Sequence, residues 1–568
     1  MDKPIWVKSL RSTYMSKSKV RKHKSQDAVV QNTRPINRFI PWLVISVVVI
    51  FIAVLRIRLL GIPLERDEGE YAYVGQLMLH GIPPFSLACN MKFPGIYAAY
   101  ALIMAIFGQS IFGIHIGLLL VNSASIILLF ILGRRPFGDI VGLSAGITYG
   151  ILSCNPSVLG MQAHATQFLV VAALGGLIYT VKAVETRKLL HAFFGGLLMA
   201  ASVLMKQHAV FLAAFAFFYL IWGLKRKQSL SGKDLIRPAV LSVIGFMVPM
   251  AILVISLLAT GSFGKFWFWT FTYASKYVSQ VPLEYAPISF WISFTRVLDG
   301  TWYLWILAGA GLVALFWDKQ LRGKRVFIVG FLISAFLAVC PGFFFRSHYF
   351  ITWLPAISLL AGIGLKGIFN VFNRFINPKA AGTIAAALFV LVAVTTIYAQ
   401  GDYYFRMTPV EACRATYFSN PFPESLEIAG YIKNHTTKDD YIAILGSEPQ
   451  ICFYSDRRSA ASALYMYPLV ESHPLAHQMQ LTTIEEIEAK KPKYIVYVNV
   501  SASWMTHPNA DRTIIDWFDQ YSNQFYQPVG LASIFNDGRP TEYLWAEEAR
   551  ICAPGSNFFI VVLQRKGS

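Results

Sequence analysis

The sequence predicts a polytopic α-helical membrane protein with about 11 transmembrane helices and a C-terminal α/β domain. Of its 568 residues, 55% are hydrophobic and only 14% are charged, which is too apolar for an ordinary soluble protein. Up to about residue 400 the apolar residues form uninterrupted blocks of membrane-spanning length. Beyond that point the composition becomes that of a soluble domain.

The first 39 residues are expected to form a basic cytoplasmic tail. They contain Lys17, Lys19, Arg21, Lys22 and Lys24, and they lack the compact apolar core and cleavage site of a secretory signal. The net charge of +19 would suggest nucleic acid in a soluble protein. Because most basic residues lie in this tail and in short loops between apolar blocks, they set the membrane topology instead. We therefore expect no nucleic-acid partner.

Residues 40–400 are expected to form the membrane domain. An odd number of spans places the two chain ends on opposite sides of the membrane. The predicted spans are residues 40–60, 112–133, 139–154, 164–182, 189–204, 207–223, 237–260, 302–317, 326–342, 348–368 and 381–400.

Basic residues alternate between successive loops as the positive-inside rule requires. Starting from a cytoplasmic N-terminus, the five inner loops near residues 134, 187, 226, 322 and 374 all carry lysine or arginine. The remaining loops and the C-terminal region are then extracytoplasmic. Nearly every polar residue that is a candidate for catalysis or binding lies in these outer loops. This placement favours a cleft on one face over scattered structural charges.

Residues 401–568 are expected to form a small extracytoplasmic α/β domain. Helix-like segments at 424–433 and 484–490 alternate with β-like runs at 441–445, 494–499 and 558–563. No glycine pattern for phosphate or dinucleotide binding is present, so we expect a lid or an acceptor-docking platform. The cysteines Cys413, Cys452 and Cys552 leave room for one disulfide in this region.

The first outer loop contains three acids in four positions, which is the most informative stretch of the chain. Asp67, Glu68 and Glu70 stand where the chain leaves the membrane, and Tyr71 follows them. Asp67 and Glu70 have the spacing of a helix N-cap with its reciprocal acid, and Gly81 marks the helix end. The acids either cap a short surface helix or form the mouth of an active site.

Several cations and aromatic residues are predicted to lie at the same membrane face. Lys206 occupies the tip of a hydrophobic hairpin, Arg346, His348 and Tyr349 open a late span, and Lys92 lies in a loop. Such residues could hold a departing phosphate, which needs fixed positive charge. The alternatives are snorkelling or interfacial anchoring for Lys206 and the Arg346 segment, and solvation for Lys92.

Together, the acids at 66–71, the Lys-Phe-Pro at 92–94, the Lys-Gln at 206–207 and the Arg-Ser-His-Tyr-Phe at 346–350 resemble the membrane glycosyltransferases of the GT-C fold. The resemblance covers roughly residues 40–400. It is closest to the protein O-mannosyltransferase and aminoarabinose lipid A transferase branch, glycosyltransferase family 39 or 83. This branch implies inverting transfer of a sugar from a polyprenyl-phosphate donor to an acceptor on the outer (periplasmic) face.

The family pattern assigns the general base to Asp67, and Glu68 is the alternative because adjacent acids cannot be ranked by sequence. Lys206, Arg346, His348 and Tyr349 are expected at the donor phosphate. The remaining substrate-binding candidates are Glu70, Tyr71, Lys92 and His164. Two departures weaken the carry-over: Phe93 replaces the first proline after the loop lysine, and the second outer loop offers His164 and Thr166 where many relatives have an acid.

The expected partners are a polyprenyl-phosphate sugar, membrane lipid, and a protein, lipid or glycan acceptor. Members of this branch often work without a metal, so no cofactor is expected to be required. Asp67 and Glu68 could hold Mg²⁺ or Mn²⁺, but no second cluster of acids completes the shell. We expect the membrane to be a bacterial inner (plasma) membrane.

Two rival functions remain open. A transporter would place its ionisable groups at mid-membrane and would often show repeated halves, whereas these charges lie at one face and no repeat is evident. A non-catalytic glycolipid-binding or assembly factor could share the same fold.

Overall fold

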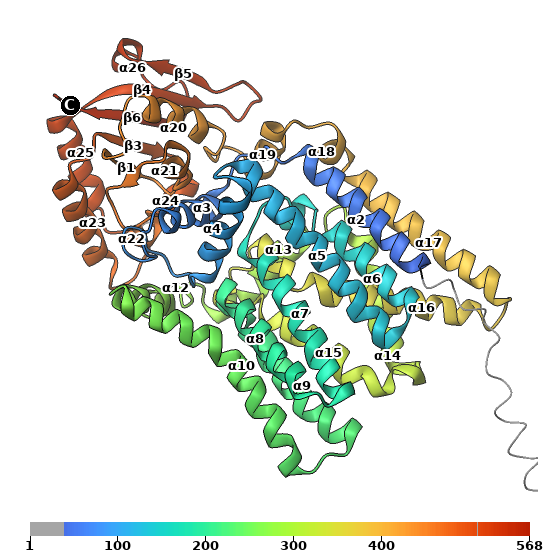
Figure 1. Ribbon diagram of the computed structural model, residues 1–568. Coiled ribbons are helices and arrows are strands. Elements are labelled where there is room, and N and C mark those ends of the chain that lie inside the picture. Colours follow the sequence, from blue (N-terminus) through green and yellow to red (C-terminus); the bar gives the residue numbers. More distant parts are fainter. Residues whose placement is uncertain (1–38, 508, 568) are drawn as a thin grey trace, which may run out of the picture.

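The computed structural model describes residues 39–507 and 509–567 and combines a bundle of long helices with a mixed α/β domain at one end of the bundle (Figure 1). The predicted basic tail lies outside the described residues, except for Phe39.

Helices of the described chain occupy all the positions predicted for membrane spans. Seven described helices are long and apolar enough to cross a membrane, or eight if the pair bent by 112° between 283–298 and 302–317 counts as one span. The protein is therefore an integral, multi-pass membrane protein, and the number eleven stays a prediction. The helices at the predicted span positions are α2 (Ile40–Arg58), α5 (Ile111–Phe137), α6 (Asp139–Leu152), α7 (Ala165–Thr186), α8 (Leu189–Met205), α9 (Val210–Gln228), α10 (Gly232–Ala259), α14 (Trp302–Trp317), α15 (Arg325–Leu337), α16 (Leu354–Phe372) and α17 (Pro378–Ala399).

Glycines allow pairs of these helices to pack with their backbones in contact, as small residues do in membrane bundles. A Cβ atom on Gly196 of α8 would lie 1.9 Å from the carbonyl oxygen of Ser242 on α10, and Gly245 of α10 meets α8 in the same way. Gly311 of α14 and Gly364 of α16 form a second such contact. The α8–α9 hairpin, whose tip faces the α/β domain, is thus fixed against α10.

Short helices fill the end of the bundle that faces the α/β domain. The apolar helix α4 was not among the predicted spans, and it packs beneath α3. These elements are α3 (Arg66–Leu79), α4 (Gly95–Phe107), η1 (Pro156–Val158), η2 (Gln207–Ala209), α11 (Phe263–Trp267), the π-helical η3 (Phe268–Tyr273), α12 (Ala274–Tyr277), η4 (Leu283–Tyr285), α13 (Ala286–Leu298), η6 (Pro341–Phe343) and η7 (Ser347–Thr352); η5 (Lys319–Lys324) lies between α14 and α15.

The C-terminal domain is built on a six-stranded mixed sheet in the order β2-β1-β3-β6-β4-β5. The first three of these strands are parallel, and β6, β4 and β5 pair antiparallel. The strands are β1 (Tyr441–Leu445), β2 (Arg458–Ser459), β3 (Tyr494–Asn499), β4 (Tyr526–Ile534), β5 (Glu542–Trp545) and β6 (Phe558–Arg565). The helices are α18 (Gly401–Phe405), α19 (Pro409–Tyr417), α20 (Glu424–Asn434), α21 (Gln450–Ser455), α22 (Tyr467–Val470), α23 (Ala476–Lys490), α24 (Ser501–Trp504), α25 (Thr513–Phe525) and α26 (Glu547–Ile551).

The α/β class predicted for this domain is confirmed, with all three predicted strands in place. Strands β4 and β5 were missed because Pro528 and the exposed polar residues around β5 obscure their alternation. The disulfide is not formed. Cys413 and Cys452 are separately buried, Cys552 is exposed, and all six cysteines, which lie within the described residues, are free.

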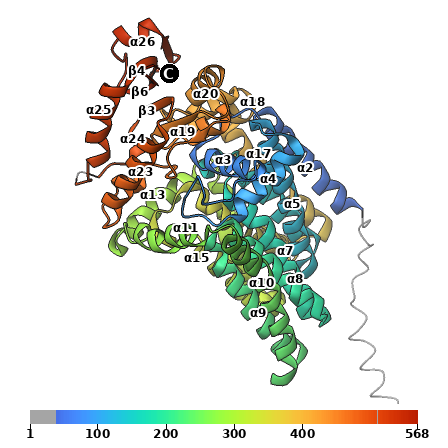
Figure 2. The same ribbon diagram turned by 60° about the vertical axis from the view of Figure 1, so that its left-hand side comes forward.

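The domain is anchored on α3 and the loop that follows it, as the blue α3 beneath the orange domain shows in both views (Figures 1 and 2). Arg66 at the start of α3 forms a 3.0 Å salt bridge with the fully buried Glu448. The backbone N–H of Cys89 donates to the carbonyl of Ser462 at 2.8 Å. The domain is therefore continuous with the end of the membrane bundle.

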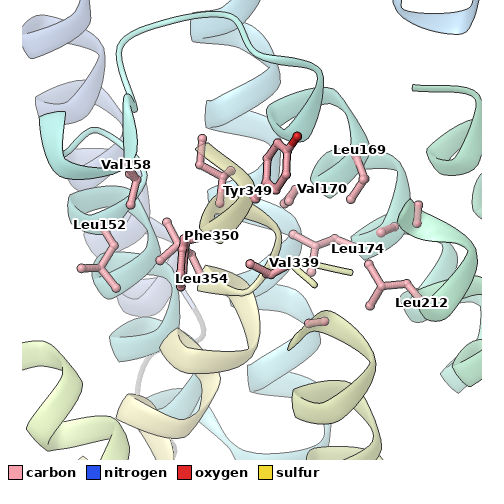
Figure 3. Packing of buried hydrophobic residues seen from close by; sticks show 14 of the residues in the cluster. Leu152, Val158, Leu169, Val170, Leu174, Leu212, Val339, Tyr349, Phe350 and Leu354 are labelled. Atoms are coloured by element: carbon pink, nitrogen blue, oxygen red, sulfur yellow. The ribbon is translucent and has the colours of Figure 1, made fainter. Parts of the chain in front are cut away.

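The segment that carries Arg346 and His348 is held by the core of the bundle. Phe350 and Ile351 of η7 are completely buried. Figure 3 shows Tyr349 and Phe350 among leucine and valine side chains that include Leu169 and Val170 of α7. This packing fixes the position of η7 at the end of the bundle.

Candidate active site

Helix α3 sets the positions of the acids, but its cap differs from the predicted one. Glu65 is the N-cap: its side chain accepts from the Glu68 backbone N–H, and the Glu68 side chain accepts from the Glu65 backbone N–H. Asp67 therefore lies inside the first turn, where its charge is stabilised by the helix dipole. The prediction of Asp67 as the N-cap was wrong because Glu65 has the same chemistry two residues earlier.

Glu68 is completely buried. Its carboxylate binds the His115 ring at 3.0 Å and accepts from the backbone N–H of Ala163 at 2.5 Å. These contacts hold the second outer loop against α3. The structure thus gives Glu68 a structural place, and it does not bring this alternative base to the cavity described below.

Glu70 is also buried, and it organises the neighbouring charges. One carboxylate oxygen, Oε2, accepts from Asn90 Nδ2 at 2.6 Å and from Lys92 Nζ at 2.9 Å, and the other accepts from the Tyr97 hydroxyl. A buried carboxylate needs several donors to replace the water that it has lost, and Glu70 has them. Glu70 therefore anchors Lys92, and we assign it no contact with substrate.

Asp67 is the acid that faces open space. Its Oδ1 atom accepts from Lys92 Nζ at 2.6 Å, whereas no hydrogen bond from the described residues reaches Oδ2. Burial alone would raise the pKa of this carboxyl, but the Lys92 ammonium outweighs that effect and holds the pKa well below its usual range. Asp67 is therefore ionised at neutral pH with one oxygen available.

A cavity of about 310 Å³ next to Asp67 collects most of the predicted site residues. Its walls are formed by side chains from α3, the loop after it, the α8–α9 hairpin, η7, the C-terminal domain and the aromatic segment, which is the stretch of α11, η3 and α12 at residues 263–277. The predicted residues in its lining are Asp67, Tyr71, Lys92, Lys206, Arg346, His348 and Tyr349. A larger groove of about 1460 Å³, near Arg296 and Tyr398, contains none of them. The smaller cavity is therefore the candidate active site.

Two cations, Lys206 and Arg346, line this cavity. Lys206 caps the C-terminus of α8, and its Nζ lies 3.8 Å from the centre of the Tyr349 ring. Burial lowers the pKa of Lys206 to about 7. The charge interaction with Tyr277 raises the pKa of Arg346 further, so its guanidinium is permanently charged. The pair is suited to binding a phosphate, and Lys206 would regain its proton when the anion arrives.

Two histidines complete the surroundings of Asp67. The rings of His164 and His348 stack at 4.2 Å, and their nearest nitrogens lie 3.9 and 3.8 Å from Asp67 Oδ2. Burial lowers the pKa of His164 to about 4 and that of His348 well below its usual range. Both rings are therefore neutral at neutral pH.

Asp67, His164 and His348 also have the ligand types of a divalent metal site. One ligand atom from each lies within 4.8 Å of the others, and neither His164 nitrogen has a hydrogen-bond partner among the described residues. Neutral imidazoles and a carboxylate suit zinc or manganese. Sequence reasoning considered only acids and missed this group, because His164 and His348 are 184 positions apart and meet only in the fold.

The cavity has further walls that sequence reasoning missed. Tyr467 comes from the C-terminal domain, Thr270 comes from η3 and Tyr277 comes from α12. An apolar run around Tyr465 and Tyr467 in an otherwise polar domain was the one available signal.

Comparison with solved structures identifies the fold of the chain. ArnT from Cupriavidus metallidurans, crystallised with undecaprenyl phosphate, superposes with a TM-score of 0.53 at 14% identity, covering 92% of this chain and 98% of that one. The archaeal oligosaccharyltransferase AglB from Archaeoglobus fulgidus, in complex with an inhibitory peptide and a dolichol-phosphate, gives 0.51 at 13% identity, covering 90% and 75%. The chain has the GT-C fold.

The sequence comparisons agree with this fold over a shorter stretch. The family model for dolichyl-phosphate-mannose-protein mannosyltransferases matches residues 92–254 of this GT-C chain, which include Lys92, His164 and Lys206. A search of curated proteins found no match. The resemblance inferred from the sequence motifs is thus confirmed for the fold.

Proposed function

We propose that this GT-C protein is an integral-membrane glycosyltransferase that moves a sugar from a polyprenyl-phosphate donor to a protein, lipid or glycan acceptor. One observation carries the proposal: an ionised carboxylate, Asp67, lines the same small cavity as the cations Lys206 and Arg346. Inverting glycosyl transfer requires a base and a stabilised anionic leaving group in one water-poor site. The sugar is hexosyl or pentosyl in this proposal.

The chemistry assigns a task to each group. The bond between the anomeric carbon and the phosphate oxygen breaks, and the phosphate leaves with the electron pair towards Lys206 and Arg346. The acceptor hydroxyl attacks the opposite face of the sugar and forms the new bond, while Asp67 Oδ2 takes its proton. His348 and Tyr349 extend the wall beside the phosphate, and Tyr71 lines the same cavity.

Lys92 keeps Asp67 ionised and oriented while leaving Oδ2 available. A carboxylate with a lowered pKa is a weak base towards a resting alcohol. It becomes adequate when attack on the anomeric carbon makes the hydroxyl proton acidic in the transition state. This timing confines proton transfer to acceptors that are already bound in line with the sugar.

The two solved relatives support the donor class. Undecaprenyl phosphate is bound to ArnT and dolichol-phosphate to AglB. Both are polyprenyl phosphates, and the cavity of this chain offers cations where such a phosphate would need them.

The decisive experiment is incubation of the purified protein with a set of polyprenyl-phosphate sugars and membrane extract, followed by mass-resolved analysis of products. A product heavier than an acceptor by one sugar residue, with release of the polyprenyl phosphate, is the expected result. Binding of a donor without transfer to any acceptor would instead identify a glycolipid-binding factor.

We propose that the site faces the extracytoplasmic side of a bacterial inner membrane and that the N-terminus is cytoplasmic. Residues 373–377, between α16 and α17, are exposed, and Cys552 is an exposed native cysteine of the C-terminal domain. In intact cells, an impermeant thiol reagent should label Cys552 and leave a cysteine introduced at Asn373 unlabelled. Asn373→Cys should be labelled after the membrane is permeabilised. Equal labelling of both positions in intact cells would contradict this orientation.

We propose further that transfer needs no resident metal, because Lys92 already neutralises Asp67 at 2.6 Å. Dialysis against EDTA should leave the transfer rate unchanged, and metal analysis should find well under one equivalent of Zn²⁺ or Mn²⁺. If activity is lost on dialysis and restored by one of these ions, Asp67, His164 and His348 form a metal centre. His164→Ala would then abolish the restoration, whereas the distant His477→Ala would preserve it.

A further inference from the structure

The C-terminal domain reaches into the candidate active site through one short segment, residues 464–470, which follows β2 and includes α22. Tyr465 and Tyr467 lie on this segment and are buried. Their rings stack at 5.0 Å with an angle of 27° between the planes. Both therefore enter the junction between the two domains as one rigid aromatic pair.

Tyr465 contacts the acids of α3 directly. Its hydroxyl lies 2.6 Å from Glu70 Oε2 and 3.3 Å from Asp67 Oδ1. The Lys92 ammonium lies 4.9 Å from the centre of the Tyr71 ring and 5.6 Å from the centre of the Tyr465 ring. The Tyr465 side chain thus contacts both carboxylates and the cation that pairs with them.

The position of the segment is fixed from both ends. The backbone N–H of Met466 donates to Ser447 Oγ at 3.0 Å, and the carbonyl of Ser447 accepts from Arg66 Nε at 2.7 Å. Beyond α22, Glu471 accepts from the hydroxyl of Tyr273 in the aromatic segment at 2.8 Å. The tyrosine pair is therefore tied both to α3 and to the opposite wall of the cavity.

Tyr467 lies at the cavity itself, together with Asp67, Lys92 and Arg346. A sugar ring bound in this cavity would therefore meet the Tyr467 side chain. Aromatic faces pack well against the C–H surface of sugars and give orientation without charge.

We propose that the C-terminal domain supplies part of the active site: Tyr465 is a positioning residue for Asp67 and Glu70, and Tyr467 forms a wall of the sugar subsite. The proposal rests on the proposed glycosyltransferase function. It replaces the sequence-based expectation of a lid or docking platform with a domain whose side chains shape the reaction site.

Tyr465→Phe tests the positioning role, since it removes only the hydroxyl. The hydroxyl has a single proton to donate and its shorter contact is with Glu70, which also binds Lys92, so its loss should loosen the arrangement that orients Asp67. We expect kcat to fall about tenfold, with the donor KM changed less than twofold. Tyr526→Phe is the matched control, because its buried hydroxyl binds the Pro492 carbonyl of the same domain at 2.7 Å.

Tyr467 is tested by a pair of variants on the same donor. Tyr467→Phe keeps the ring and should retain the wild-type donor KM, whereas Tyr467→Ala should raise it about tenfold. Thermal unfolding of each detergent-solubilised variant reports folding separately.

The outcomes separate this inference from the function on which it rests. Wild-type protein that transfers no sugar overturns the proposed function. Active wild-type protein together with a kcat of Tyr465→Phe that matches the kcat of Tyr526→Phe overturns the positioning role. Equal donor KM values for Tyr467→Ala and wild type remove Tyr467 from the sugar subsite.

Discussion

Replacing Asp67 by asparagine is expected to lower turnover by ~10²–10⁴ while donor affinity stays largely intact. The amide keeps the size of the side chain but cannot accept the proton of the acceptor hydroxyl. A capping explanation does not apply, because Glu65 caps α3 and Asp67 lies inside the helix. The measurement is turnover and donor binding on folded, detergent-solubilised protein.

Two comparisons make this test specific. Asp139→Asn removes an acid that pairs with Arg134 away from the cavity, and it should leave turnover unchanged. Glu68→Gln should lower stability through the contacts of Glu68 with His115 and Ala163, without a selective loss of turnover in the folded fraction. Full turnover in Asp67→Asn would remove it as the base, and a selective loss in Glu68→Gln would move that role to Glu68.

Removal of the positive charge of either Lys206 or Arg346, the residues proposed to bind the phosphate, is expected to weaken donor binding by roughly 2–5 kcal/mol. This is the range found when one partner of a desolvated charge pair is truncated. Arg346→Ala and Lys206→Ala are the test variants. Arg296→Ala is the control, since it lies in the larger groove that contains none of the predicted site residues. Unchanged donor affinity in both variants would return Lys206 and Arg346 to the role of membrane anchors.

The pH dependence of binding distinguishes the two cations. The pKa of Lys206 is about 7 in the free cavity, where Asp67, Lys92 and Arg346 are the charges that act on it. The lysine is therefore charged below pH 7 and increasingly neutral above it. Donor affinity should fall as pH rises from 6 to 8.5 in wild type and in Arg346→Ala. Lys206→Ala should lose this dependence, because Arg346 stays charged throughout.

The pattern of apolar blocks and charges along the chain predicted the candidate site residues whose positions are set locally. Asp67, Lys206 and Arg346 are charges at the ends of apolar blocks, and the ends of a bundle meet at one membrane face. Lys92 was placed in the right loop, yet its contact with Asp67 depends on how α4 packs beneath α3. Local spacing could not decide between Glu65 and Asp67 as the cap, because either carboxylate is able to accept a backbone N–H, and in the structure Glu65 does so.

Long-range contacts account for what the pattern could not show. Glu68 is an acid next to Asp67 in the sequence, and its buried partners, His115 of α5 and the backbone N–H of Ala163, come from distant parts of the chain. The stacking of His164 on His348 joins two outer loops. Tyr465 meets Glu70 across 395 positions. Such pairings follow from the packing of domains, and no local period encodes them.

The buried pair of Arg66 and Glu448 has a consequence for biosynthesis. The two residues are 382 positions apart, so the ribosome needs roughly 20–75 s at ordinary translation rates to make the second after the first. During that interval α3 is already at the membrane surface, and its arginine and three acids have no domain above them. The wall that residues 464–470 contribute to the site is added only after β1 and the turn that carries Glu448. Chains that terminate before Glu448 therefore leave Arg66 without its partner and the candidate site without Tyr465 and Tyr467.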